Sequence, residues 1–348
     1  MITDKIRGCL IAGAAGDALG YEVEFMCRRA ILSRFGEEGI RKFALDDKGK
    51  ALISDDTQMT LFTASGLLSA EAQGKEPIYA ITRAYIDWYY TQTPKLRKKT
   101  ICKISAIPEL NRLRAPGNTC LSALESIARG KEPLNNSKGC GGIMRVAPIA
   151  LFAAKREEYN DSAVARLAAE ASEVTHQHPL GFLPSALFSL LIYKLLPLTP
   201  AQAECEIGNI VAESFAVLDN IYPNRYEAEK EYLKEITQKA IELAHSTTPD
   251  ADAILQLGEG WVAEETWAIA LYCAIRHIGS VEEAIAASVN HDGDSDSTGS
   301  VCGNIMGAIY GYGHIKERNI FCPDGKELEE TLELSGTILA IADEIATN

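Results

Sequence analysis

Apolar residues recur along most of the chain with the roughly 3.6-residue period of an amphipathic helix, whereas strict alternation of apolar and polar residues is rare. This predominance predicts an all-α protein. Helices are expected over residues 57–70, 78–90, 119–129, 161–174, 184–196, 201–218, 226–245, 263–277, 281–289, 299–311 and 327–346. Prolines and glycines fall between these segments, as is typical of turns.

No long linker, composition shift or flexible glycine and serine tract divides the predicted helices. We therefore expect one domain that covers residues 1–348 and is built as a compact bundle of helices. Residues 28–53 are less regular and rich in charge and glycine. They are a candidate for a mobile loop over a site.

Two helical segments carry small residues at every fourth position. These are Gly8, Ala12, Gly16 and Gly20 in the first, and Gly299, Gly303, Gly307 and Gly311 in the second. Spacing of four places them along one helix face, where the missing side chains let another backbone approach closely. Each glycine costs about 1 kcal/mol of helix stability relative to alanine. We therefore expect tight core packing, or packing that also brings the start of each helix to a shared site.

The composition of the chain excludes several classes of function and location. The chain has 34 Lys and Arg against 48 Asp and Glu, a net charge of −14, which opposes binding to nucleic acid or anionic lipid. The longest apolar run, residues 180–193, is shorter than the roughly 20 residues that span a bilayer. The nine cysteines form no C-x-x-C pair. Asp4 is an acid in the region where a signal peptide carries only positive charge, so no signal peptide is expected. We expect a cytoplasmic protein with reduced thiols and no membrane contact.

Three aspartates alternate at Asp292, Asp294 and Asp296, among hydroxyl residues and directly before the second glycine-bearing helix. A helix N-cap needs one such residue, whereas three repel one another unless a cation lies among them. Carboxylate and hydroxyl oxygens suit Mg²⁺, Mn²⁺ or Ca²⁺. An EF-hand is rejected because Ser297 stands at its glycine position and Gly303 at its final glutamate position.

A second acidic cluster, Ser54-Asp55-Asp56-Thr57, opens another predicted helix. One reading is an N-cap with acids favourably placed in the first turn. Two adjacent acids flanked by hydroxyls exceed that need, and with Asp294 and Asp296 they would supply ligands for two hard cations. Paired metals can orient a substrate and generate a nucleophile from water.

The first glycine-bearing helix is followed by a further carboxylate, Glu24. Glu24 is a candidate acid or base, with a surface carboxylate as the alternative. Asp17 is a candidate for holding the site residues in place without binding a metal itself. Gly20 suits a helix C-cap.

A glycine-rich turn contains Gly139, Cys140, Gly141 and Gly142 and leads into an apolar segment. Its successive N–H groups could cradle a phosphate, with an ordinary tight loop as the alternative. The Lys-Ser/Thr ending of a P-loop is absent. His176 is read either as a partner of a helix C-terminus or as a substrate contact, and no histidine pattern predicts zinc.

In this order the motifs resemble the ADP-ribosylglycohydrolase family, which includes the ADP-ribosylarginine hydrolases and dinitrogenase reductase-activating glycohydrolase. The resemblance spans nearly the whole chain. It rests on residues 16–20 with Glu24-Phe25, residues 54–57, Gly117-Asn118-Thr119, residues 139–148, Thr175-His176 and residues 293–297. It implies an all-α orthogonal bundle with a dinuclear Mg²⁺ or Mn²⁺ centre. The implied metal ligands are Ser54, Asp55, Asp56, Asp294, Asp296 and Ser297.

The resemblance also implies that the cations hold the distal ribose and a water near its anomeric carbon. The implied substrate-binding residues are Asn118, Gly139, Cys140, Gly141, Gly142, Met144 and His176. Catalysis is expected from Asp55, Asp56 and Glu24, with Asp56 or Glu24 taking a proton from the water. The expected reaction removes ADP-ribose from a modified acceptor, most simply arginine on a protein, by a monomeric enzyme.

Three alternatives stay open. The substrate is another ADP-ribose conjugate, the enzyme cleaves a nucleotide diphosphate instead, or the chain is a non-catalytic ADP-ribose-binding member of the fold.

The chain departs from the family pattern at a few positions. Serine stands at positions 54 and 297, where many members of the family carry threonine, and it keeps the hydroxyl. Tyr21-Glu22 replaces a common small residue and proline, which bears on the conformation of the Glu24 loop.

Overall fold

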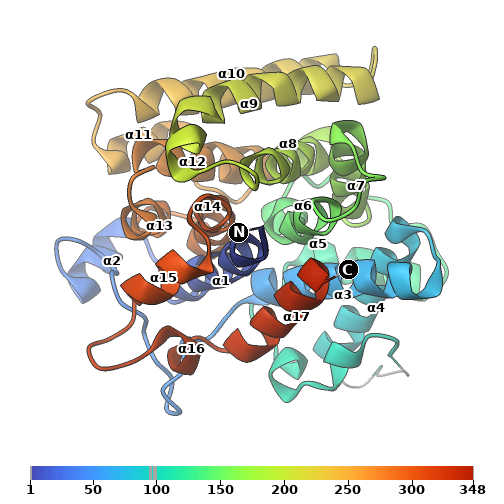
Figure 1. Ribbon diagram of the computed structural model, residues 1–348, viewed down its shortest axis with the longest axis horizontal. Coiled ribbons are helices and arrows are strands. Elements are labelled where there is room, and N and C mark those ends of the chain that lie inside the picture. The colour runs from blue at the N-terminus through green and yellow to red at the C-terminus, as the bar shows by residue number, and fades with distance from the viewer. Residues whose placement is uncertain (1, 94–95, 97–99, 348) are drawn as a thin grey trace.

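The computed structural model describes residues 2–93, 96 and 100–347 (Figure 1). The predicted all-α fold is confirmed, because the described residues form seventeen α-helices and no strand. The helices are α1 (Ile2–Tyr21), α2 (Arg28–Phe35), α3 (Asp55–Gln73), α4 (Pro77–Gln92), α5 (Asn118–Ala128), α6 (Ala147–Ala153), α7 (Asp161–Glu173), α8 (Pro179–Leu195), α9 (Pro200–Ile221), α10 (Glu227–Ala244), α11 (Asp250–Leu257), α12 (Ala263–Arg276), α13 (Val281–Val289), α14 (Ser295–Tyr310), α15 (Tyr312–Arg318), α16 (Leu328–Thr331) and α17 (Ser335–Thr347). The described 3-10 helices include η2 (Lys103–Ala106), η3 (Pro108–Asn111) and η4 (Cys140–Arg145).

The predicted helix over residues 327–346 is wrong as one element. It divides into α16 and α17, because Leu332 leaves the helix to pair with Ala51 in an isolated parallel bridge and Leu334 adopts φ 60°. A contact with a residue distant in sequence thus overrides the local helical pattern. The helix α2 lies within the segment expected to be irregular, and α6, α11 and α15 are short helices that the pattern did not predict.

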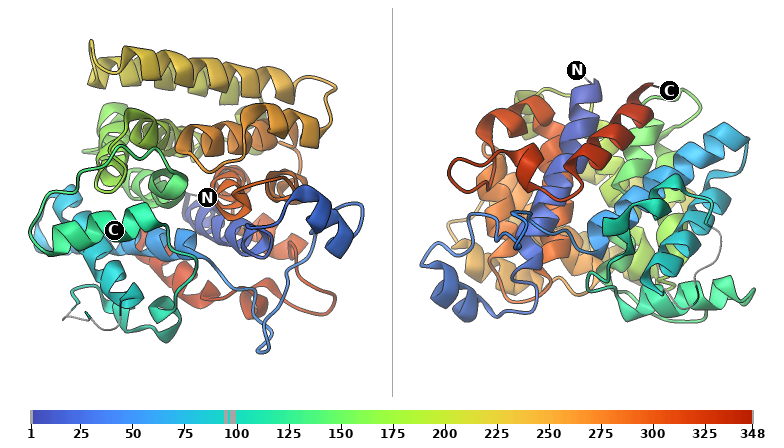
Figure 2. Two further views of the ribbon diagram at one scale, coloured as in Figure 1. Left: turned by 180° about the vertical axis from the view of Figure 1, so that it is seen from behind. Right: turned by 90° about the horizontal axis from the view of Figure 1, so that it is seen from below.

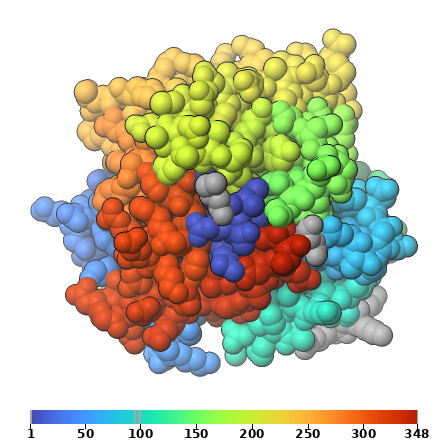
Figure 3. Space-filling model, viewed as in Figure 1, coloured from blue at the N-terminus to red at the C-terminus, as the bar shows by residue number. Residues whose placement is uncertain are grey.

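The helices lie in successive layers (Figure 1). The pair α9 and α10 lies along one edge, with α8 and α12 beneath it, α14 and α1 at the centre, and α3, α4 and α17 on the opposite side. Seen from below, α1 runs through the molecule from one face toward the other (Figure 2). Its N-terminal end reaches the surface at the middle of the face shown in Figure 3, beneath α9. No helix in the described ranges combines the length and the apolar character needed to cross a bilayer.

The central pair, α1 and α14, packs through the two rows of small residues. A Cβ added to Gly16 would lie 2.0 Å from the carbonyl oxygen of Gly299, and one added to Gly303 would lie 2.1 Å from that of Ala12. Only glycine allows backbones to approach this closely. Because the helices are antiparallel, the C-terminal end of α1 meets the N-terminal end of α14. The start of each helix was expected at a shared site. This is wrong for α1, because its C-terminal end lies beside the start of α14.

Candidate metal and substrate site

The first acidic cluster sits at the buried start of α3. Ser54 caps the helix and accepts from the N–H of Asp56 at 3.1 Å, while Asp55 and Asp56 occupy the first turn. Asp17 of α1 fixes this turn, because its carboxylate accepts from the N–H groups of Ser54 at 3.0 Å and Thr57 at 3.1 Å. Asp17 therefore holds the first turn of α3 in place, as the sequence indicated.

The second acidic cluster forms the start of α14. Asp294 is its N-cap residue and accepts from the N–H of Ser297 at 3.3 Å, and Asp296 accepts from the same N–H at 2.9 Å. Close packing at Gly20, where an added Cβ would lie 2.2 Å from the Ser295 carbonyl oxygen, brings this turn against the end of α1. Asp292 stands apart, because it is exposed and accepts from the N–H of Arg28 at the start of α2.

Glu24 lies against the second cluster, and the charges of Asp296, Asp294 and Asp55 all act on it. One carboxylate oxygen from each of Glu24, Asp294 and Asp296 lies within 4.8 Å of the other two. Glu24 is only 7% exposed, so it is not the surface carboxylate considered as the alternative. Its Oε2 and the Oδ2 of Asp56 are buried without a hydrogen-bond partner among the described residues.

Burial and mutual repulsion dominate the electrostatics of these groups. Desolvation, followed by the charge of Asp296, raises the pKa of Asp55, Asp56 and Asp294 well above the ordinary range. The same causes raise the pKa of Glu24 to about 10. Among the described residues, no lysine or arginine forms an ion pair with any of these carboxylates or with Asp296. The cluster therefore lacks a protein countercharge, and its unpaired oxygens and adjacent hydroxyls fit a hard divalent cation.

The glycine-rich turn forms η4 and touches the acidic cluster. The Cys140 thiol donates to Oδ2 of Asp294 at 2.7 Å. The N–H of Gly139 donates to the Ser137 hydroxyl at 3.3 Å, and the N–H of Cys140 donates to the Trp261 carbonyl at 3.3 Å. Two of the N–H groups expected to cradle an anion thus have protein partners already.

The other predicted substrate residues differ in their surroundings. Asn118 is exposed at the first position of α5, and the backbone of the adjacent Gly117 hydrogen-bonds to Asp55. Met144 lies within η4, and its side chain is buried in the hydrophobic core. His176 is 2% exposed and packs on the glycine-rich turn.

His176 is not a charged partner of a helix end. Burial, aided by the nearby Arg145 charge, lowers its pKa to about 3. Interaction with a helix C-terminus requires the protonated form. The neutral imidazole therefore does not fit the first interpretation, and the contact to substrate stays a prediction.

An exposed aromatic pair next to the site was missed in the sequence. Phe25 is 76% exposed and Trp261 is 39% exposed, yet their rings stack with centroids 6.1 Å apart and planes at 19°. Phe25 directly follows Glu24, while Trp261 is joined by its backbone to Cys140. No sequence signal links two residues so far apart, although the Glu24-Phe25 motif marks one of them.

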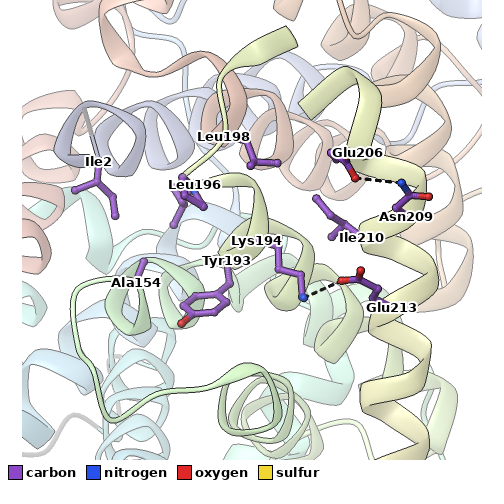
Figure 4. Close-up of a pocket in the computed structure, with 11 residues that line it drawn as sticks. Ile2, Ala154, Tyr193, Lys194, Leu196, Leu198, Glu206, Asn209, Ile210 and Glu213 are labelled. Carbon is purple, nitrogen blue, oxygen red and sulfur yellow. Dashed lines mark hydrogen bonds and ion pairs between the residues drawn. The ribbon is translucent and has the colours of Figure 1, made fainter. Parts of the chain in front are cut away.

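A separate hollow of about 530 Å³ lies at the other end of α1 (Figure 4). Ile2, Leu196, Leu198 and Ile210 contribute apolar walls, and Lys194 hydrogen-bonds to one rim residue, Glu213, at 3.1 Å. None of the predicted site residues lines it. A helix of this length spans about 30 Å, so this hollow is remote from Glu24.

Known proteins resemble this chain over nearly all of its length. The model of the ADP-ribosylglycohydrolase family matches residues 1–347. ADP-ribosylhydrolase ARH3 of Danio rerio is 25% identical over 338 residues, which cover 89% of this chain and 84% of that protein. ADP-ribosylhydrolase ARH1 of Dictyostelium discoideum is 26% identical over an alignment of 407 residues, which covers 99% of this chain and 94% of that protein. A solved ADP-ribosylglycohydrolase-related protein complex shares the fold, with a TM-score of 0.60 at 22% identity over 99% of this chain and 98% of that one.

Proposed function

The chain belongs to the ADP-ribosylglycohydrolase family and is a hydrolase of ADP-ribosylated substrates, and we propose that it releases ADP-ribose from modified arginine side chains. The observation that carries this proposal is the group of buried carboxylates at the end of α1 and the starts of α3 and α14, which act on one another and lie against the glycine-rich turn. A nucleotide-containing substrate needs both parts, one at its ribose and one at its diphosphate.

Two divalent cations, Mg²⁺ or Mn²⁺, are proposed to bind in this cluster. The ligands would be Ser54, Asp55, Asp56, Asp294, Asp296 and Ser297. When bound, the cations would supply Lewis acidity that orients ribose hydroxyls and acidifies a water.

The protein's own groups then carry the proton. Bound cations would offset the repulsion that raises the pKa values of Asp56 and Glu24 and would favour their ionised forms. Each also holds a buried carboxylate oxygen without a partner among the described residues, so either could then accept a proton from the attacking water. The water oxygen bonds to the anomeric carbon as the bond from that carbon to the acceptor nitrogen breaks. The nitrogen leaves with the bonding electron pair as a neutral guanidine and takes up the proton held by the carboxylate, so that ADP-ribose and the unmodified guanidinium are the products.

The aromatic pair supports arginine as the acceptor. Guanidinium groups are planar cations that stack on aromatic faces, and Phe25 and Trp261 expose such faces beside Glu24. A serine acceptor offers neither the plane nor the charge.

Trp261→Ala tests this assignment. Loss of one exposed cation–π contact is expected to raise KM for ADP-ribosyl-arginine about two- to fivefold and to leave KM for ADP-ribosyl-serine unchanged. Steady-state kinetics on both conjugates measures the difference. Tyr79→Ala, which removes an exposed aromatic side chain from the first turn of α4, serves as the control and should change neither value. An equal rise for both conjugates would assign Trp261 to the ADP-ribose half instead.

Cation binding is expected to stabilise the fold, because it neutralises buried carboxylates that otherwise repel one another. At a cation concentration 100 times the dissociation constant the gain is about 2.7 kcal/mol, which raises Tm by several degrees. Thermal melts in Mg²⁺, Mn²⁺ and chelator measure this. Asp292→Ala should keep the full shift, since Asp292 contacts α2 instead of the cluster. Equal Tm values with cation and chelator would contradict the metal site.

Product analysis tests the reaction class. The proposed glycosidic cleavage yields intact ADP-ribose from an arginine conjugate, and chromatography of the products identifies it directly. A dinuclear phosphohydrolase would release AMP instead. A chain that binds ADP-ribose and converts none of the conjugates would be a binding member of the fold.

A further inference from the structure

Arg145 is a fully buried cation for which the proposed reaction gives no role. Its guanidinium lies 4.2 Å from the centre of the Tyr85 ring and donates to the Ala171 carbonyl at 3.0 Å and the Thr175 hydroxyl at 2.6 Å. Within the described ranges no carboxylate forms an ion pair with it. Burying a cation without an opposite charge is costly, so its retention calls for an explanation.

The Thr175 hydroxyl must accept the hydrogen bond from Arg145, and this fixes which group can receive the proton of the hydroxyl. A guanidinium can only donate, so Thr175 Oγ1 accepts from Arg145 and has one proton left to give. Two nitrogen or oxygen acceptors are near, His176 Nδ1 at 2.9 Å and the Ser172 carbonyl at 3.4 Å, while the Cys120 sulfur within reach is only a weak acceptor. The Ser172 carbonyl already accepts from the N–H groups of Thr175 at 3.1 Å and His176 at 3.0 Å. The hydroxyl proton is therefore directed to Nδ1.

An imidazole that accepts at Nδ1 and is neutral carries its proton on Nε2. In this position Nε2 faces the glycine-rich turn: a Cβ added to Gly139 or to Gly141 would lie 3.3 Å from it. Nε2 has no hydrogen-bond partner among the residues that the structure places, although His176 is almost entirely buried. The structure thus presents an unpaired donor to the turn.

We propose that Arg145 and Thr175 are positioning residues that hold His176 in its Nε2–H form, so that it donates to the diphosphate of ADP-ribose at the glycine-rich turn. The identity of this ligand rests on the proposed function. The donor complements the N–H groups of Gly139 and Cys140, which are occupied by Ser137 and Trp261. A neutral donor keeps this arrangement over the whole physiological pH range.

Thr175→Val and Thr175→Ser form a matched pair, because valine keeps the shape without the hydroxyl and serine keeps the hydroxyl. In the wild type and Thr175→Ser, nitrogen-15 NMR of His176 is expected to show protonated Nε2 and bare Nδ1. In Thr175→Val the Nδ1–H form becomes populated. The Kd for ADP-ribose, measured by calorimetry, should rise about tenfold in Thr175→Val and stay near wild type in Thr175→Ser. At saturating substrate, kcat should change little.

A double-mutant cycle separates positioning from a general loss of packing. His176→Phe should weaken ADP-ribose binding as much as Thr175→Val, and the two changes together should add little more. An Nδ1–H signal in the wild type, or equal loss of affinity in Thr175→Val and Thr175→Ser, would overturn the relay. Wild-type protein that shows the Nε2–H signal but binds no ADP-ribose would refute the proposed function and its ligand, leaving the Arg145–Thr175–His176 geometry intact.

Discussion

Asp55→Ala and Asp296→Ala are each expected to lower the rate of ADP-ribose release about a thousandfold while leaving the helical content unchanged. Each change removes a proposed cation ligand, and a loss of about 4 kcal/mol of transition-state stabilisation corresponds to that factor. The fold should tolerate the change, because Asp55 lies among carboxylates that repel one another, and burial raises the pKa of Asp55. Single-turnover kinetics and circular dichroism measure the two effects.

Asp292→Ala is the matched control for this pair. It removes an aspartate from the same loop as Asp296, but one that is exposed and bound to the N–H of Arg28. Its activity should stay within about twofold of wild type, as is usual for a surface substitution. Near-normal turnover in Asp55→Ala or Asp296→Ala would refute the dinuclear site.

Gly16→Ala is expected to destabilise the protein by about 3 kcal/mol, a large effect for one methyl group. The added Cβ would lie 2.0 Å from the Gly299 carbonyl oxygen, so α1 and α14 must separate. The same movement would draw Asp294 and Asp296 away from Glu24, and cation binding should weaken along with stability. Denaturant unfolding and a cation titration of the folded variant measure the two losses.

Gly208→Ala is the control for the glycine substitution. Gly208 lies exposed in α9, and a Cβ there meets nothing within 4 Å. Because alanine favours a helix over glycine by about 1 kcal/mol, this variant should be slightly more stable than wild type. If Gly16→Ala were also neutral or stabilising, the close packing of α1 on α14 could not be what positions the cluster.

The features that the sequence predicted well are those encoded within a few residues. The four-residue spacing of glycines predicted a close helix contact, and capping chemistry placed the two acidic clusters at helix starts, where Ser54 and Asp294 prove to be the N-cap residues. The crowding of acids beyond the needs of a cap predicted a cation site, and the structure brings Glu24, Asp294 and Asp296 together in a cluster that could hold one. These signals require only the period of a helix and the ligand preferences of hard cations.

The features that it did not predict depend on contacts between distant segments. The spacing of small residues does not say that α1 and α14 are antiparallel, and so it placed the wrong end of α1 near the site. The break between α16 and α17 arises from the pairing of Leu332 with Ala51. The stacking of Phe25 on Trp261 likewise leaves no local pattern.

The most direct test of the central claim is the release of ADP-ribose from ADP-ribosyl-arginine by chelator-treated protein as Mg²⁺ or Mn²⁺ is added back. We predict no turnover after chelation, full recovery once about two cations are bound per chain, and no recovery in Asp296→Ala. Undiminished turnover in the presence of chelator would contradict the account.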